Sequence, residues 1–101
     1  MTHTVTVQRA HQPISRRAEF QNSTKALRGV RTVPHQSWIG TGWLPREHRA
    51  AVLAADYVVY SYATPIAWHV PGEGWTVPDV KYSVTTSRHQ AQARLGAKIG
   101  A

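Results

Sequence analysis

The side chains of this sequence that could bind a metal ion or move a proton are six histidines and five acids, and no cysteine accompanies them. Without cysteine, thiolate metal sites and disulfides are excluded. The histidines show no metal-ligand spacing, and a His-Glu-x-x-His pattern is absent. They are His3, His11, His35, His48, His69 and His89. We predict no metal site, although one assembled only by the fold stays open, and expect surface or hydrogen-bonding roles for these histidines.

Nucleophilic catalysis has no signature in the chain either. There is no Gly-x-Ser-x-Gly, and no acid is spaced to orient a histidine near Ser83 or Ser87. A Walker loop and the dinucleotide glycine fingerprint are also absent. The run from Thr85 to His89 opens a predicted helix whose N–H groups could bind an anion, but an ordinary N-cap explains it as well. We expect no catalytic residue, no cofactor and no enzymatic activity.

The net charge of +7 is arranged in blocks along the chain. Residues 1–50 carry eight Lys or Arg and two acids, residues 51–80 carry three acids and no Lys or Arg, and residues 81–101 carry four Lys or Arg and no acid. Nine of the twelve cations are arginines, which suit bidentate contacts to phosphate or carboxylate. Such a charge is typical of nucleic-acid binding, and a merely solubilising charge is the alternative.

The first 18 residues are interpreted as a basic and flexible arm before a single domain at 19–101. Arg9, Arg16 and Arg17 lie in this segment, and the alternation of Val5 and Val7 with threonine makes a short strand the other interpretation. The N-terminus lacks the apolar core of a signal peptide, and no run approaches the roughly 20 apolar residues of a membrane span. We expect a cytoplasmic protein without membrane contact.

Residues 19–55 predict a strand, a turn and a strand, then a loop and a helix. Asn22 and Ser23 favour the turn. The loop from His35 to Trp43 holds Gly40, Gly42 and two tryptophans, of which at least one is expected to plug the core, with a surface platform as the alternative. The helix begins near Leu44-Pro45 and ends at Asp56. Its small apolar stripe is expected to face a sheet: Leu44, Ala51, Val52 and Ala55.

A β-hairpin is predicted from Tyr57 to Val84, followed by a C-terminal helix. Large residues occupy the even positions up to a turn at residues 71–74: Val58, Tyr60, Tyr62, Ile66, Trp68 and Val70. Pro65 indicates an edge or a bulge, and the return strand needs a register switch near Val77–Asp79. Ser87 to Gln90 matches a capping box. The predicted fold class is therefore α+β, a small antiparallel sheet of hairpins with one packed helix and a C-terminal helix.

Two strings in this region resemble a family of short, uncharacterised proteins encoded by actinobacteriophages and their hosts. They are YVVYSYATPIAW at residues 57–68 and KYSVTTSRHQ at residues 81–90, with FQNST at residues 20–24 upstream. The resemblance covers roughly Glu19 to Leu95. It implies a phage or actinobacterial origin and no particular mechanism.

Two binding hypotheses follow. In the first, basic flanks of the hairpin scaffold contact nucleic-acid phosphates while a Trp or Tyr stacks on bases. Its candidate cations are Arg16, Arg17, Arg28, Arg31, Arg88, Arg94 and Lys98. In the second, the chain is an interaction module for a host or phage protein, with aromatic hot spots and an open oligomeric state. Its candidate contacts are Trp38, Trp43, Tyr60, Tyr62 and Trp68.

Overall fold

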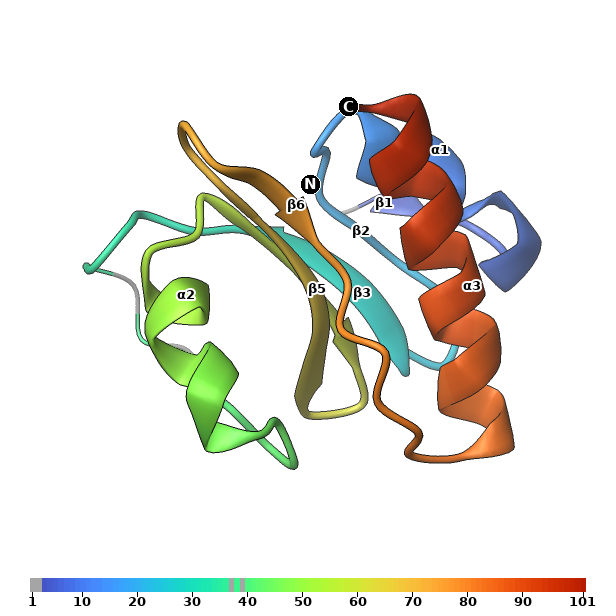
Figure 1. Ribbon diagram of the computed structural model, residues 1–101. Helices are drawn as coiled ribbons and strands as arrows, with labels where there is room; N and C mark the ends of the chain where they lie inside the picture. The colour runs from blue at the N-terminus through green and yellow to red at the C-terminus, as the bar shows by residue number, and fades with distance from the viewer. Residues whose placement is uncertain (1–2, 37, 39) are drawn as a thin grey trace.

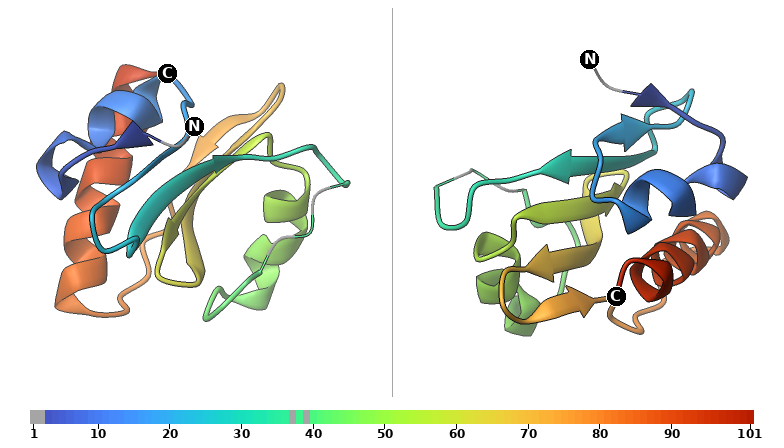
Figure 2. Two further views of the ribbon diagram at one scale, coloured as in Figure 1. Left: turned by 180° about the vertical axis from the view of Figure 1, so that it is seen from behind. Right: turned by 90° about the horizontal axis from the view of Figure 1, so that it is seen from above.

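The computed structural model describes residues 3–36, 38 and 40–101, and in these residues a six-stranded sheet separates helices on its two faces (Figures 1 and 2). The strands lie side by side in chain order: β1 (His3–Thr4), β2 (Phe20–Gln21), β3 (Leu27–Arg31), β4 (Tyr57–Ser61), β5 (Thr64–Val70) and β6 (Gly74–Thr76). Neighbours are antiparallel except β1 and β2, which are parallel. The predicted α+β class is confirmed.

Three α-helices and two 3₁₀ turns complete the described chain. They are η1 (Val7–Arg9), α1 (His11–Ser15), η2 (Arg46–His48), α2 (Arg49–Leu53) and α3 (Val84–Ile99). Helices α1 and α3 cover one face of the sheet, and α2 covers the other (Figure 1). The predicted helix at 44–55 is present as η2 and α2. Its apolar stripe faces the sheet as expected, while Arg46 and Arg49 are exposed. No helix of the described residues is long and apolar enough to cross a membrane.

Strand β4 lies at the centre of the sheet, and all five of its residues are buried. Tyr57 and Val59 belong to the core cluster under α1 and α3, whereas Val58 and Tyr60 belong to the cluster under α2. A strand buried on both faces reads as a continuous apolar run rather than a clean alternation. The two faces of β4 therefore use both phases of the sequence pattern, not only the even one.

A β-bulge in β5 separates residues that the alternation placed together. Val59 pairs with Ala67 and Tyr60 pairs with Pro65, which leaves Ile66 as the extra residue. Ile66 consequently packs under α1 and α3, while Trp68 stays on the α2 face. The expectation that Ile66 shares the face of Trp68 is wrong. The prediction of an edge or a bulge at Pro65 is confirmed.

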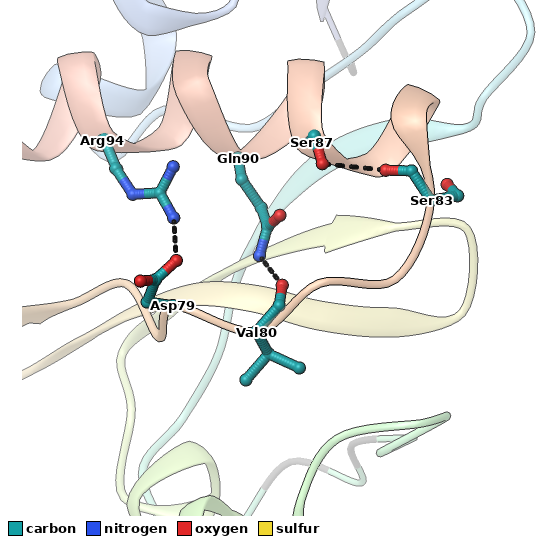
Figure 3. Close-up of polar contacts among 6 residues, drawn as sticks. All are labelled: Asp79, Val80, Ser83, Ser87, Gln90 and Arg94. Carbon is teal, nitrogen blue, oxygen red and sulfur yellow. Dashed lines mark hydrogen bonds and ion pairs between the residues drawn. The ribbon is translucent and has the colours of Figure 1, made fainter.

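The return strand is shorter than predicted, because β6 ends at Thr76 and residues 77–83 form no strand. Pro78 has no N–H to donate to a ladder, and side chains of α3 bind this segment instead (Figure 3). The Gln90 amide donates to the carbonyl of Val80 at 2.9 Å, and the Arg94 guanidinium lies 3.4 Å from the Asp79 carboxylate. The register switch predicted at Val77–Asp79 therefore does not occur.

The N-cap of helix α3 lies four residues earlier than predicted. The Ser83 hydroxyl accepts a hydrogen bond from the Thr86 N–H at 3.1 Å, so Ser83 is the N-cap. Ser87 lies inside the helix, and its hydroxyl donates to the Ser83 carbonyl at 2.9 Å (Figure 3). The capping box predicted from Ser87 to Gln90 is wrong, since Gln90 is used to hold Val80.

The segment interpreted as an N-terminal arm packs into the domain over its described residues. Ala10 and Ile14 are fully buried in the core under α3. The Tyr57 hydroxyl donates to the Ala18 carbonyl at 2.8 Å, and both the main-chain N–H and the ring of His11 contact the Gln92 amide oxygen. Gly96 permits this packing, because a Cβ there would lie 2.5 Å from the Ile14 side chain. Burial of apolar side chains is the physical reason for this ordered N-terminus.

Candidate functional site

The seven cations predicted to contact phosphate lie in two separate layers of the molecule. Arg28 and Arg31 are on β3. The others belong to the helical layer over the opposite face: Arg16 and Arg17 directly after α1, and Arg88, Arg94 and Lys98, which are exposed on α3. Arg94 is partly neutralised by the exposed Asp79. Arg94 and Lys98 are four residues apart and form a basic stripe along one side of α3, from which Arg88 points away. The fold sets Arg28 apart from this stripe.

The five predicted aromatic contacts divide into exposed and buried residues. Trp38 and Trp43 are 91% and 85% exposed and Tyr62 is 56% exposed, whereas Trp68 is fully buried and Tyr60 is 6% exposed. The expectation that one loop tryptophan plugs the core is wrong, because Leu44, Val52 and Trp68 fill that face. The prediction of Trp68 as a surface contact is also wrong. It lies under α2 with the His48 ring 5.5 Å away.

Arg28, Trp38 and Tyr60 meet in a cavity of about 420 Å³ on the α2 side of β3, which we call the arginine groove. Its lining residues are Arg28, Val30, Arg31, Thr32, Trp38, Gly40, Tyr60 and Ala63. The Arg28 guanidinium carbon lies 4.4 Å from the centre of the Tyr60 ring. Arg31 lies at the rim, because strand alternation turns its side chain away from the face of Arg28. Burial raises the pKa of Tyr60 while Arg28 opposes that rise, so the phenol is neutral at pH 7.

A second cavity of about 300 Å³ lies on the other side of the β4–β5 turn, and we call it the hydroxyl pocket. It is lined by Trp43, Ser61, Tyr62, Thr64, Tyr82, Ser83 and Thr86, none of which is charged. The Ser61 hydroxyl lies 2.7 Å from His89 Nδ1 and 3.0 Å from the Thr86 hydroxyl. The Ser83 hydroxyl donates to Thr86 Oγ1 at 3.1 Å. Burial lowers the pKa of His89, which is therefore neutral at pH 7.

A third cavity of about 360 Å³ continues from the hydroxyl pocket towards α3. It shares Tyr82 and Ser83 with that pocket and adds Lys81, Val84 and Ser87. Ser87 lies on the same side of α3 as Arg94 and Lys98, which follow it seven and eleven residues later. The arginine groove reaches the β4–β5 turn at Ala63, the hydroxyl pocket is lined by the neighbouring Tyr62 and Thr64, and the third cavity adjoins the hydroxyl pocket. No described residue lining them is acidic.

Sequence reasoning missed the hydroxyl network of Ser61, Thr86 and His89. A weak signal was present, because Ser61 is a small polar residue between two tyrosines at the end of a strand of otherwise large side chains. Thr86 and His89 are three residues apart and share one face of a helix. Neither Thr86 nor His89 stands out in the sequence, and only the packing of α3 on β4 places both of them against the Ser61 hydroxyl. His89 does have the hydrogen-bonding role that was expected for a histidine.

A serine hydroxyl and a histidine ring meet beside the hydroxyl pocket. A Ser–His pair is the beginning of a nucleophilic site. Within the described chain, however, His89 contacts the Ser61 hydroxyl and the Tyr62 ring, and neither of these is acidic. No group of three or more His, Asp or Glu residues able to hold a metal ion occurs in the described part of the chain. Aromatic rings and hydroxyls are the groups that these cavities present.

Residues 10–98 match a family of unknown function, DUF8033. The chain belongs to that family. An uncharacterised family was the expectation from the sequence strings, and this match extends it upstream, since it begins at the buried Ala10 rather than at Glu19. The DUF8033 match thereby includes α1, β3, all three cavities and α3 up to Lys98. No curated protein and no solved structure matches the chain.

Proposed function

We propose that this chain binds single-stranded nucleic acid along the surface that begins in the arginine groove. The observation that carries the proposal is the placement of the Arg28 guanidinium over the Tyr60 ring, in one cavity with the 91% exposed indole of Trp38. A flat cation beside an exposed ring can contact a phosphate and stack on a base at the same time. Duplex nucleic acid buries its base faces, so stacking of this kind favours a single strand.

Electrostatics support an anionic ligand. The chain carries a net charge of +7, and residues 81–101 contain four cations and no acid. From the third cavity, Arg94 and Lys98 continue along the Ser87 side of α3, and Arg88 is exposed on the neighbouring side. A strand leaving the cavities would meet this stripe and release counterions there. The proposal thus retains both layers of predicted cations, with stacking at the groove and phosphate contacts along α3.

The proposed setting follows the resemblance in the sequence. We infer a protein of phage or actinobacterial origin that acts in the bacterial cytoplasm and binds without catalysis. Its ligand would be host or phage nucleic acid. The absence of a catalytic signature in the sequence and the uncharged, hydrogen-bonded state of His89 support a binding role.

The test is a fluorescence-anisotropy titration of labelled 12-nucleotide single strands at 50 and 200 mM salt. We expect affinity to fall steeply with salt, because phosphate contacts release counterions. Trp38→Ala should weaken binding roughly 5- to 100-fold through lost base stacking. Arg28→Gln should weaken it as well, and Arg49→Gln serves as the matched control, since Arg49 is exposed on α2 and lines none of the three cavities. Binding that is absent at 50 mM salt contradicts the proposal.

A protein partner is the second candidate function, and one observation favours it. Trp43, Tyr62 and Val84 are 85%, 56% and 74% exposed around the hydroxyl pocket and the third cavity. Exposed Trp and Tyr beside Arg are also the residues of protein hot spots. Affinity purification from an actinobacterial host, with and without nuclease, separates the two candidates. A defined protein that stays bound after nuclease, and is lost in Trp43→Ala, would favour the second.

A further inference from the structure

The hydroxyl pocket differs from the arginine groove in having no charged lining residue, so it suits a neutral part of a ligand. Three of its side chains are polar and more than nine-tenths buried: Ser61 is 2%, Thr64 is 6% and Thr86 is 5% exposed. Hydroxyl groups this deeply buried contribute little to the solubility of the protein, so solubility does not explain their place in the cavity lining. Its volume of about 300 Å³ is at the lower end of ligand pockets, which fits a single sugar or nucleoside.

The hydroxyls of this pocket keep hydrogen-bonding capacity for a ligand. A hydroxyl has one donor and two acceptor positions. Ser61 uses two of its three positions, one toward Thr86 and one toward His89. Thr86 uses two, toward Ser61 and Ser83, and Thr64 accepts from the Trp43 N–H at 3.0 Å. Each of the three can therefore make at least one more bond, and His89 holds the Ser61 hydroxyl in place.

Aromatic side chains form the open walls of the pocket. The Trp43 indole is 85% exposed, although its main chain is fixed by the hydrogen bond to Thr64. Tyr62 has a φ of 57°, a left-handed conformation that holds its side chain at the tip of the β4–β5 turn, where it is 56% exposed. An aromatic face beside several hydroxyl groups can take a stacked base together with its sugar.

The pocket adjoins the arginine groove across a narrow ridge. Ala63 lines the groove, while its neighbours Tyr62 and Thr64 line the pocket. Gly42 packs against this turn so closely that a Cβ would lie 2.7 Å from the Ala63 carbonyl oxygen. Trp38 and Trp43 are five residues apart, so their Cα atoms are within about 18 Å of each other. One short strand can therefore occupy both sites.

We propose that the hydroxyl pocket binds the ribose of one nucleotide through its 2′-hydroxyl and so makes the chain selective for RNA over DNA. The inference rests on the proposed function and adds the class of nucleic acid. Ser61, Thr64 and Thr86 are the recognising side chains, and Trp43 stacks on the attached base. The 2′-hydroxyl is the one group of the strand that distinguishes RNA from DNA at a given site, and it is both a donor and an acceptor, like the hydroxyls that face it.

The experiment compares (rU)12 with (dU)12, which differ only at the 2′ position, by fluorescence anisotropy with the full chain. We expect (rU)12 to bind about 5- to 10-fold more tightly, the effect of one or two net hydrogen bonds. Thr86→Val should remove this ratio by weakening (rU)12 alone. Thr85→Val is the matched control, because Thr85 is exposed and lines none of the three cavities. Circular dichroism checks that both variants fold.

A chemically modified oligonucleotide keeps the inference testable if Thr86→Val fails to fold. Wild-type protein should bind 2′-O-methyl (U)12 as weakly as (dU)12, because the methyl group removes the donor. Equal affinity for (rU)12 and (dU)12 would overturn the inference, and it would leave the proposed function intact provided that Arg28→Gln weakens both. Failure of both strands to bind at 50 mM salt would overturn the proposed function and the inference together.

Discussion

The tryptophans of the sheet and those of the 33–44 loop have opposite fates in this chain. Trp68 is fully buried between β5 and α2, whereas Trp38 and Trp43 are 91% and 85% exposed. The side chains are chemically identical, so their positions in the fold decide which of them are buried. Trp68 sits on a strand face covered by a helix, while the loop tryptophans flank Gly40 and Gly42 beside a core that Leu44 and Val52 already fill. Stability and binding are thereby assigned to different residues of one type.

The largest expected effect comes from removing the buried tryptophan of the sheet. Trp68→Ala should lower the free energy of unfolding by about 3–5 kcal/mol, because it leaves a cavity under α2. Trp38→Ala is the control and should change it by no more than about 0.5 kcal/mol, as an exposed loop residue. Urea denaturation followed by circular dichroism measures both. Similar losses in the two variants would show that the loop indole packs onto the domain in solution.

Gly96→Ala probes the packing of α1 on α3, away from the cavities. Alanine favours a helix by about 1 kcal/mol over glycine, but its Cβ would lie 2.5 Å from the Ile14 side chain. We expect the overpacking to outweigh the propensity and to cost about 1–3 kcal/mol. A more stable variant in thermal denaturation would mean that α1 is not held against α3.

The two serines at the start of α3 give a smaller, paired effect. Ser83→Ala removes the N-cap hydrogen bond to Thr86 and should cost about 1 kcal/mol. Ser87→Ala removes only an exposed bond to the Ser83 carbonyl and should cost about 0.5 kcal/mol or less. Thermal melts of the two variants, compared with wild type, measure the difference. The reverse order would restore the Ser87 cap expected from the sequence.

The smallest effect concerns pH and the buried imidazole of the hydroxyl pocket. Burial lowers the pKa of His89 below the ordinary value, so the unfolded chain takes up the proton first as the pH falls. The stabilisation from the neutral ring is complete above about pH 7.5 and is lost as the pH falls through 6.5 towards the folded-state pKa. Melting temperatures at pH 7.5 and 5.5 should show this fall in wild type and a weaker one in His89→Asn. Equal pH dependence of the melting temperature in wild type and His89→Asn would contradict this role of His89.

The sequence predicted the fold where its patterns were local. The Asn22–Ser23 turn, the helix after Leu44 and the reversal after Val70 depend on turn residues and periodicity, and all are present. The single strand expected from Tyr57 to Val70 is wrong, because the chain also reverses at Tyr62–Ala63 and forms β4 and β5. What failed depends on tertiary contacts. The face of the sheet on which Ile66 lies depends on a β-bulge. The start of α3 depends on Gln90, which binds the Val80 carbonyl instead of capping the helix. The packing of residues 10–18 depends on Gly96, about 80 residues away in the sequence.

The candidate site was predictable only in part. Arg28, Trp38, Trp43 and Tyr62 were singled out from residue type and charge, and the fold places them in the lining of the arginine groove and the hydroxyl pocket. Trp68 and Tyr60 were not separable from them by type alone, because a period-2 pattern does not show which face a helix covers. The Ser61–His89 contact joins residues 28 apart in sequence and has no motif.

Tryptophan fluorescence during an oligonucleotide titration tests the central claim most directly, because exposed and buried indoles respond differently to a stacking ligand. Adding (rU)12 at 50 mM salt should quench emission from the exposed indoles of Trp38 and Trp43. Most of this quenching should disappear in the Trp38→Phe, Trp43→Phe double variant, in which the emission of the remaining Trp68 and Trp75 should stay unchanged, because neither lines the cavities. Quenching that persists in the double variant, or binding with no quenching in wild type, would contradict base stacking in the arginine groove and the hydroxyl pocket.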